Sequence, residues 1–116
     1  MPSALNTFAD LICNRHKYPI PANTLEYSRL VLADTIAAIV GGMAEPEMQK
    51  LVNTDLPPGK ISILGTNLKS DYLNASFITG TAGTFLEMDE GNQFARGHPA
   101  IHVVPALLAI SQKTKV

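Results

Sequence analysis

Three carboxylates and a histidine lie close together in the last third of the chain. Glu87, Asp89 and Glu90 fall within four positions, and His98 follows after a short polar loop. In a crowded group of carboxylates one member tends to keep a proton near neutral pH, and histidine exchanges protons in the same range. The cluster therefore predicts a site for general acid–base chemistry. The alternative is a solvated helix end with no chemical role.

The loop before His98 contains two side chains that could hold a carboxylate. Arg96 can form two parallel hydrogen bonds with a carboxylate group, and Asn92 offers an amide in the same loop. Arg96 would either neutralise Glu87 or Glu90, or bind the carboxylate of a substrate. In the second case, we expect Arg96 or Asn92 to orient that substrate beside the acid–base residues.

A second histidine, His102, follows His98 by four positions. Two histidines at this spacing on one helix can hold a metal ion. Pro99 and Pro105 argue against a continuous helix from His98, so we predict no metal site here. The final helix is expected to begin near residues 103–104 instead, with Pro105 in its first turn.

The composition of the 116 residues narrows the class of protein. Hydrophobic residues make up 46% and charged residues 16%, which suits a folded domain with a core. The net charge of −1 and the scattered basic residues predict no nucleic-acid partner. The single cysteine, Cys13, excludes an internal disulfide and fits a reducing compartment such as the cytoplasm. The first residues lack a basic start and a long apolar run, so we expect no signal peptide. The longest apolar run, 30–43, is too short and too polar to span a membrane.

Apolar residues at helical spacing dominate the chain, so we predict an all-α, helical-bundle-like domain over residues 1–116. Ser3 is expected to cap the first helix, which covers about residues 4–14. The second helix is expected to run to about residue 40 and to end at the two glycines 41–42. A short third helix starts at Pro46. At most one short strand is expected, near residues 60–64, where the residues are β-branched.

Polar residues before the second and fourth helices are candidates for their caps. Asn23 or Thr24 is expected to cap the second helix, and Ser70 the fourth. The inner face of the fourth helix is predicted to consist of Leu73, Phe77, Ile78, Ala82 and Phe85.

Two glycines, Gly80 and Gly83, interrupt this fourth helix. Each costs a helix about 1 kcal/mol relative to alanine. A chain accepts that cost where something must approach the backbone closely. We expect another helix packed at short distance, with a ligand or a subunit partner in the same groove as the alternative.

Six pieces of the sequence, in this order, resemble the MmgE/PrpD family, which includes 2-methylcitrate dehydratase, cis-aconitate decarboxylase and iminodisuccinate epimerase. The pieces are Val31–Gly42, Ile63–Thr66, Gly80–Gly83, Leu86–Glu90, His98–Pro99 and Val104–Ala109. Each piece is weak by itself, but the ordered set is fairly specific. The similarity covers the whole chain.

The resemblance implies chemistry on small di- and tricarboxylates without a metal or organic cofactor. Family members remove or add a proton next to a carboxylate, and then eliminate water, lose carbon dioxide or invert a centre. The acidic cluster of the dehydratases and decarboxylases matches Glu87, Asp89 and Glu90, and their histidine matches His98. Gly91 stands where those members have threonine, and the loop to the histidine is about one residue longer. Both departures favour an epimerase-like or uncharacterised subgroup.

The resemblance also implies a larger enzyme with a helical domain, a separate α+β lid and, usually, two identical subunits. Residues 1–116 match only the N-terminal portion of the helical domain, so we expect an incomplete site that is inactive alone. The partners expected are a small polycarboxylate substrate and a second copy or a complementary chain. The alternative is a non-catalytic dimerisation or partner-binding module. That alternative predicts an exposed apolar surface on the last helix and on residues 80–84.

Overall fold

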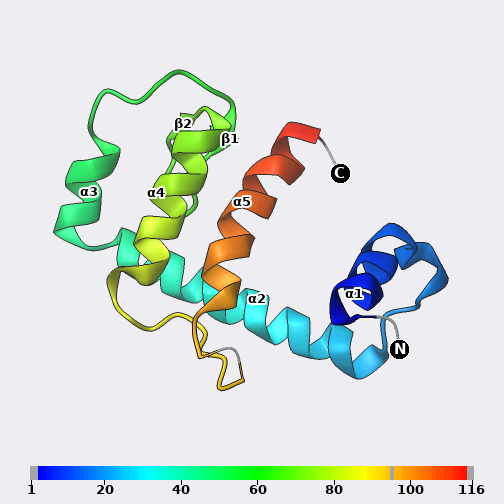
Figure 1. Cartoon of the computed structure of the whole chain (residues 1–116). Helices are drawn as coiled ribbons and strands as arrows, with labels where there is room; N and C mark the ends of the chain where they lie inside the picture. Colours follow the sequence, from blue (N-terminus) through cyan, green and yellow to red (C-terminus); the bar gives the residue numbers. More distant parts are fainter. Residues whose placement is uncertain (1–2, 95, 115–116) are drawn as a thin grey trace.

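The computed structural model describes residues 3–94 and 96–114, and most of them are helical. The elements are α1 (Ala4–Cys13), the 3-10 helix η1 (Arg15–Lys17), α2 (Ala22–Met43), α3 (Pro46–Val52), β1 (Ile61–Ser62), β2 (Lys69–Ser70), α4 (Tyr72–Phe85) and α5 (Pro99–Thr114). Helices α4 and α5 lie side by side across the long helix α2, whereas α1 lies apart (Figure 1). The predicted all-α class is confirmed.

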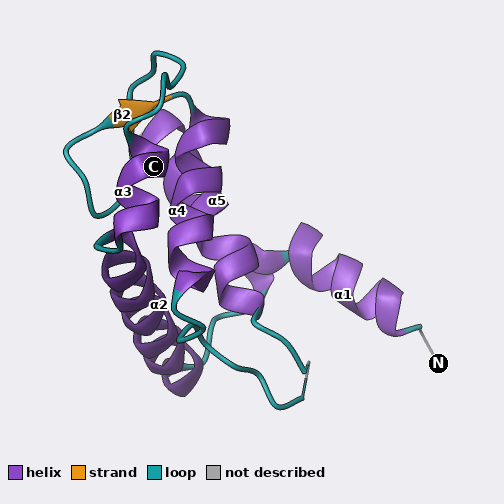
Figure 2. Cartoon of the chain, turned by 90° about the vertical axis from the view of Figure 1, so that its left-hand side faces the viewer, coloured by secondary structure: helices purple, strands orange, loops and turns teal. Residues whose placement is uncertain are grey.

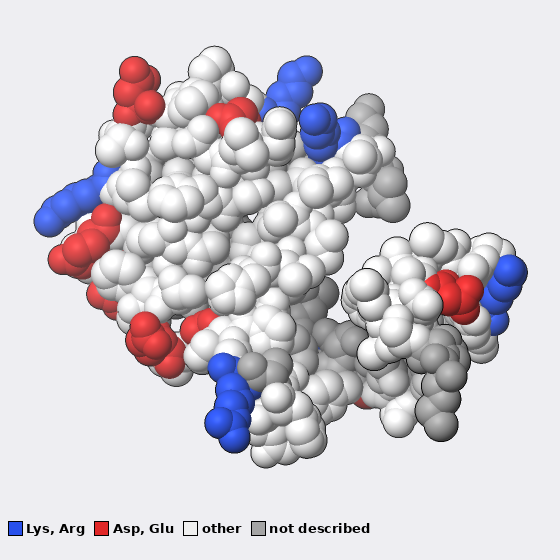
Figure 3. Space-filling model, in the orientation of Figure 1, with Lys and Arg blue, Asp and Glu red and all other residues white. Residues whose placement is uncertain are grey.

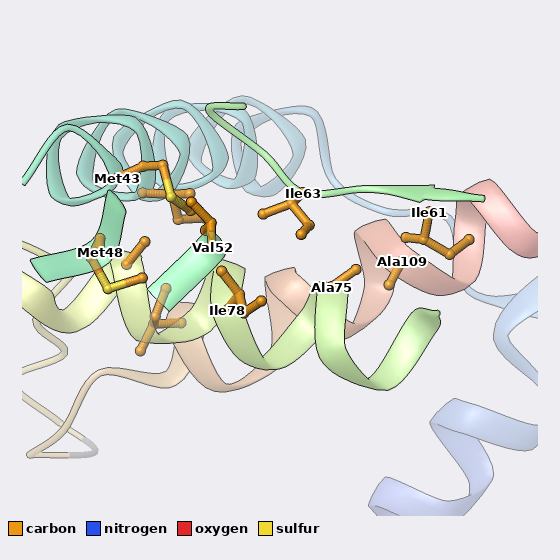
Figure 4. Packing of buried hydrophobic residues seen from close by; sticks show 11 residues of the cluster. Met43, Met48, Val52, Ile61, Ile63, Ala75, Ile78 and Ala109 are labelled. Atoms are coloured by element: carbon orange, nitrogen blue, oxygen red, sulfur yellow. The ribbon is translucent and has the colours of Figure 1, made fainter. Parts of the chain in front are cut away.

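The structure contains one strand more than the sequence predicted. Strand β1 pairs with β2 in an antiparallel register that places Ile61 opposite Ser70. Two apolar side chains of this segment, Ile61 and Ile63, are buried in the same cluster as Ala75 of α4 and Ala109 of α5 (Figure 4). The small sheet therefore closes one end of the α4–α5 pair.

Small residues lie where the three main helices approach one another. A β-carbon built on Gly42 of α2 would lie 1.9 Å from the carbonyl oxygen of Ala82 in α4. A β-carbon on Gly83 would lie 2.2 Å from Cδ1 of Ile101 in α5 and 3.0 Å from Cγ1 of Ile39 in α2. The sequence left two explanations open for Gly83, a closely packed helix and a ligand or subunit partner. The structure shows the closely packed helix.

Helix α2 is longer than predicted. It continues through both glycines to Met43, and Ala44 follows as its C-cap. The predicted cap residues, Asn23 and Thr24, lie inside the first turn, and Pro21 precedes the helix without a side-chain cap. No single helix in the described residues is long and apolar enough to cross a membrane; α2 and α3 meet that test only as a pair, and they are bent by 87° at the break.

The predicted cap of α4 is off by one residue. Asp71 is the cap, and its Oδ1 accepts hydrogen bonds from the backbone nitrogens of Leu73 at 2.8 Å and Asn74 at 3.2 Å. Ser70 belongs to β2, and its hydroxyl donates to the carbonyl oxygen of Pro57 at 2.8 Å. The hydrogen bond from the side-chain amide of Asn74, followed by those from the backbone nitrogens of Asn74 and Leu73, lowers the pKa of the Asp71 carboxyl.

The inner face of α4 also differs from the prediction. Ile78 and Ala82 are buried as expected, but Leu73 and Phe77 are both 65% exposed and Phe85 is exposed as well. The face that meets α2 and α5 is made mainly of small residues. Its buried members are Ala75, Ile78, Thr79, Ala82 and Gly83.

Helix α5 begins four residues earlier than predicted. Pro99 is its first residue, a position where the missing backbone donor costs nothing. Pro105 lies buried inside the helix, on the side that faces Gly80. The argument from the two prolines against a helix starting next to His98 was therefore wrong.

The first helix agrees with its predicted bounds, but it packs on nothing except η1 among the described elements. Ser3 caps it by accepting a hydrogen bond from the backbone nitrogen of Asn6 at 3.2 Å. None of its residues is buried, and it projects from the body of the molecule (Figure 2). Near its other end, Asp10 accepts hydrogen bonds from the side-chain amide of Asn14 and the hydroxyl of Tyr18, which link α1 to the residues on either side of η1.

We expect the α1–η1 unit to lose structure at both extremes of pH. The bond from Tyr18 lowers the pKa of Asp10, so its stabilising effect is present above about pH 4 and is lost as the pH falls through the lowered pKa. The same bond raises the pKa of Tyr18, so its effect is complete below about pH 10 and is lost as the pH rises through the raised pKa. Amide NMR signals of α1 followed against pH would measure both limits. Tyr18→Phe has no hydroxyl to ionise, so it should abolish the alkaline limit and move the acid limit to a higher pH. Two unchanged limits would contradict the role of the bond.

Candidate acid–base site

The candidate site lies in the loop that joins α4 to α5, residues 86–98. Helix α4 ends at Phe85, and the backbone nitrogen of Glu87 donates to the carbonyl oxygen of Thr84 at 3.1 Å. Glu87 has a φ of +52°, so the chain leaves the helix through a left-handed residue. The three carboxylates therefore lie beyond the helix end and not on its last turn.

The structure brings Asp89 and His98 together. Nδ1 of His98 lies 3.2 Å from Oδ2 of Asp89 and 3.3 Å from the main-chain carbonyl oxygen of the same residue. The Asp89 side chain is only 4% exposed, whereas that of His98 is 47% exposed. A buried carboxylate thus lies beside Nδ1 of a ring that is about half exposed.

Glu90 has a partner that sequence reasoning missed. Its Oε2 accepts a hydrogen bond from the backbone nitrogen of Ala100 at 3.2 Å, in the first turn of α5. A negative charge at this position is favoured by the helix dipole. The carboxylate of Glu90 therefore fastens the loop to α5, and its predicted catalytic role stays a prediction.

Arg96 and Glu87 are both exposed. The backbone nitrogen of Asn92 donates to the carbonyl oxygen of Gly97 at 2.8 Å, and that of Arg96 donates to the carbonyl oxygen of Asn92 at 2.7 Å. This tight turn places Arg96 at a φ of +50°. Neither predicted ion pair of Arg96, with Glu87 or with Glu90, is present in the described residues. Of the two alternatives for Arg96, the binding of a substrate carboxylate is the one still open.

A polar hollow of about 360 Å³ lies beside the loop. It is lined by Tyr27 of α2 and by residues 90–94. A mainly apolar groove of about 430 Å³ adjoins it between α2 and α5 and shares Tyr27 and Glu90 with it. Asp89, Arg96 and His98 do not line the polar hollow, so the predicted site residues do not all converge on one cavity.

Charged side chains are spread thinly around the molecule. On the face shown in Figure 3 they lie mainly near the edges, and most of the surface between them is uncharged. Within residues 3–94 and 96–114, no three histidine, cysteine, aspartate or glutamate side chains gather in a way that could hold a metal ion. His102 is exposed on α5.

The comparison with protein families places this helical domain. Residues 6–116 match the family model described as the MmgE/PrpD N-terminal domain. The chain belongs to the MmgE/PrpD family and corresponds to the N-terminal portion of its members. Searches of curated proteins and of solved structures each found no match to the chain.

Proposed function

We propose that the chain supplies an acid–base part of a cofactor-independent enzyme that acts on small di- or tricarboxylates. The reaction would be a dehydration, decarboxylation or epimerisation at the carbon next to a carboxylate. The observation that carries the proposal is the contact of His98 with the buried Asp89 in the loop after α4. Membership of the MmgE/PrpD family supports it.

In this proposal His98 moves the proton. Its ring is half exposed and can meet a substrate in solution, while the opposite edge of the ring is held by Asp89. The guanidinium of Arg96 would bind a substrate carboxylate, with the amide of Asn92 beside it. Glu87, which is also exposed, would be the second acid of the site.

The open position of His98 suggests that a second polypeptide surface completes the site. Proton removal next to a carboxylate creates a reactive carbanion, which an enzyme protects by excluding water. We therefore propose that the chain works with a second copy or with a complementary chain, in the cytoplasm, and that it turns over little substrate alone.

The first test is ligand binding, because it does not require turnover. We expect citrate added to millimolar concentration to shift the NMR signals of Arg96 and His98. Arg96→Gln should weaken binding by about tenfold or more, since a hydrogen bond to a charged group contributes about 1.5–3 kcal/mol. Arg15→Gln, which changes an exposed arginine of η1, is the matched control. Equal affinity of the Arg96 and Arg15 variants would contradict the proposed binding site.

The second test is proton exchange with solvent. Deuterium incorporation into 2-methylcitrate, cis-aconitate and iminodisuccinate would be followed by NMR, first with the chain alone and then with its purified partner. Exchange in only one of the three would also identify the reaction class. Absence of exchange in the complete assembly, together with absence of binding, would reject the proposed function.

One observation favours a second candidate function, a helical dimerisation or partner-binding module. The outer face of α5 exposes Val103, Leu107 and Ile110, as this alternative predicts. This alternative also predicts an exposed apolar surface on residues 80–84, but Ala82 and Gly83 are covered by the chain's own helices. Light scattering of the parent chain and of Leu107→Glu is the test. A dimer that the substitution dissociates would support the module, and a monomer in both would reject it.

A further inference from the structure

The contacts of Nδ1 in His98 define which form of the neutral ring is stable. Nδ1 lies 3.3 Å from the main-chain carbonyl oxygen of Asp89 and 3.2 Å from its Oδ2. A main-chain carbonyl can only accept a hydrogen bond, and so can an ionised carboxylate. The hydrogen bond to the main-chain carbonyl oxygen therefore requires Nδ1 to carry the proton, and Oδ2, which lies at ion-pair distance, favours the same form. Nε2 is then the nitrogen with the free lone pair.

Burial of the Asp89 carboxylate is energetically unfavourable, and packing does not explain it. Its Oδ2 is buried and has no hydrogen-bond partner of good geometry in the described residues. The 3.2 Å approach of Nδ1 is the one ion-pair contact that the described residues give it. A buried charge without full compensation destabilises a protein, and such local costs are expected where a residue serves function.

The loop is fastened on both sides of Asp89. Before it, the backbone of Glu87 is bonded to the last turn of α4. After it, the side chain of Glu90 is bonded to the first turn of α5, which His98 directly precedes. Asp89 is therefore held in a fixed place relative to the ring of His98.

From this geometry we propose that Asp89 is a positioning residue, which keeps neutral His98 in the tautomer with the proton on Nδ1. Nε2 is then the atom that takes up the substrate proton and returns it. The last step depends on the proposed function, whereas the tautomer does not. Asp89 itself gains and loses no proton in the cycle. An aspartate fixes the tautomer of a catalytic histidine in the same way in serine proteases.

The experiment reads the two ring nitrogens directly. The full chain, labelled with 15N-histidine, is examined by NMR at an alkaline pH above which the 15N shifts of the ring no longer change, so that only the two neutral tautomers are read. We expect the parent chain to show a protonated Nδ1 and an unprotonated Nε2 in His98. Asp89→Asn keeps the main-chain carbonyl but replaces the charged oxygens by an amide that can donate to Nδ1, so the ratio of the two tautomers should shift toward Nε2–H by up to about tenfold. Asp55→Asn, the same substitution at an exposed aspartate outside this loop, should leave the ratio unchanged.

A structural role alone would give a different pattern. Asp89→Asn removes a buried charge, so we expect the variant to unfold at the same or a higher urea concentration than the parent. A large loss of stability with an unchanged tautomer ratio would overturn the inference. So would a parent chain in which Nε2 carries the proton.

Activity separates this inference from the proposed function. In an assembly that turns over, Asp89→Asn should lower kcat and leave KM nearly unchanged, because Asp89 does not touch the substrate. If the tautomer shifts but no carboxylate is exchanged or bound, the proposed function fails and the positioning role stands. If exchange is normal and the tautomer does not respond, the positioning role fails and the function stands.

Discussion

Replacing Gly42 with alanine is expected to lower the free energy of unfolding by about 3 kcal/mol, although alanine favours a helix by about 1 kcal/mol over glycine. The added β-carbon would lie 1.9 Å from the carbonyl oxygen of Ala82 and 2.9 Å from its carbonyl carbon. Both atoms belong to the backbone of α4, so they cannot rotate away as a side chain would. The two helices would have to separate, which opens the core they share. Urea unfolding followed by circular dichroism measures the change.

Gly80→Ala is the matched control for this prediction. Gly80 lies in α4 near the same crossing, but a β-carbon there would meet only the ring of Pro105, at 3.7 Å. That distance is an ordinary contact, so the variant should gain up to about 1 kcal/mol from helix propensity. If both variants change the stability by the same amount, helix propensity alone decides the result, and the close crossing is contradicted.

His98→Gln should slow the exchange of the substrate's carbon-bound proton by a factor of about 100 to 10,000, the usual contribution of a general acid–base group. Glutamine keeps a similar size and polarity but cannot take up a proton near neutral pH. The measurement is deuterium incorporation by NMR, in the assembly in which the parent chain turns over.

His102→Gln is the control, since it changes an exposed histidine one turn into α5 and makes no contact with Asp89. We expect this variant to exchange at the parent rate. An unchanged rate in the His98 variant would remove His98 from the proposed mechanism, whatever its effect on binding.

The helices were predictable where local signals decide them. Ser3 before α1 and Pro46 at the start of α3 are such signals, and the structure confirms both. The end of α2 was not predictable in this way. Glycines usually end a helix, but Gly42 is retained inside α2 because α4 crosses there at short distance. The tertiary contact overrides the local preference.

The buried face of α4 could not be chosen from periodicity. The helix is apolar on nearly every side, so several apolar stripes fit its sequence equally well. Large side chains such as Leu73 and Phe77 were natural choices for a core, but α2 and α5 approach α4 too closely to admit them. Small residues occupy the contact, and the large ones are left on the outside.

In the candidate site, the sequence predicted that an acid and His98 would meet, and Asp89 is the acid that the structure places there. The hydrogen bond from the backbone nitrogen of Ala100 to Glu90 was not predicted, because the expected start of α5 was too late in the chain. Pro99, a proline at the first position of the helix, was the available signal for that start. The absence of an ion pair between Arg96 and these acids depends on the turn at residues 92–97, which no local pattern specifies.

The isolation of α1 has a thermodynamic consequence. Because η1 is the only described element with which this helix shares contacts, almost none of its stability is coupled to the core formed by α2, α4 and α5. A helix of 10 residues is only marginally stable by itself. Native-state hydrogen exchange should therefore divide the chain into two cooperative units, with α1 opening at a small fraction of the free energy needed to unfold the rest. A single melting temperature would describe only the larger unit. Any partner that covers α1 would also have to order this helix, and that cost would reduce the net free energy of binding.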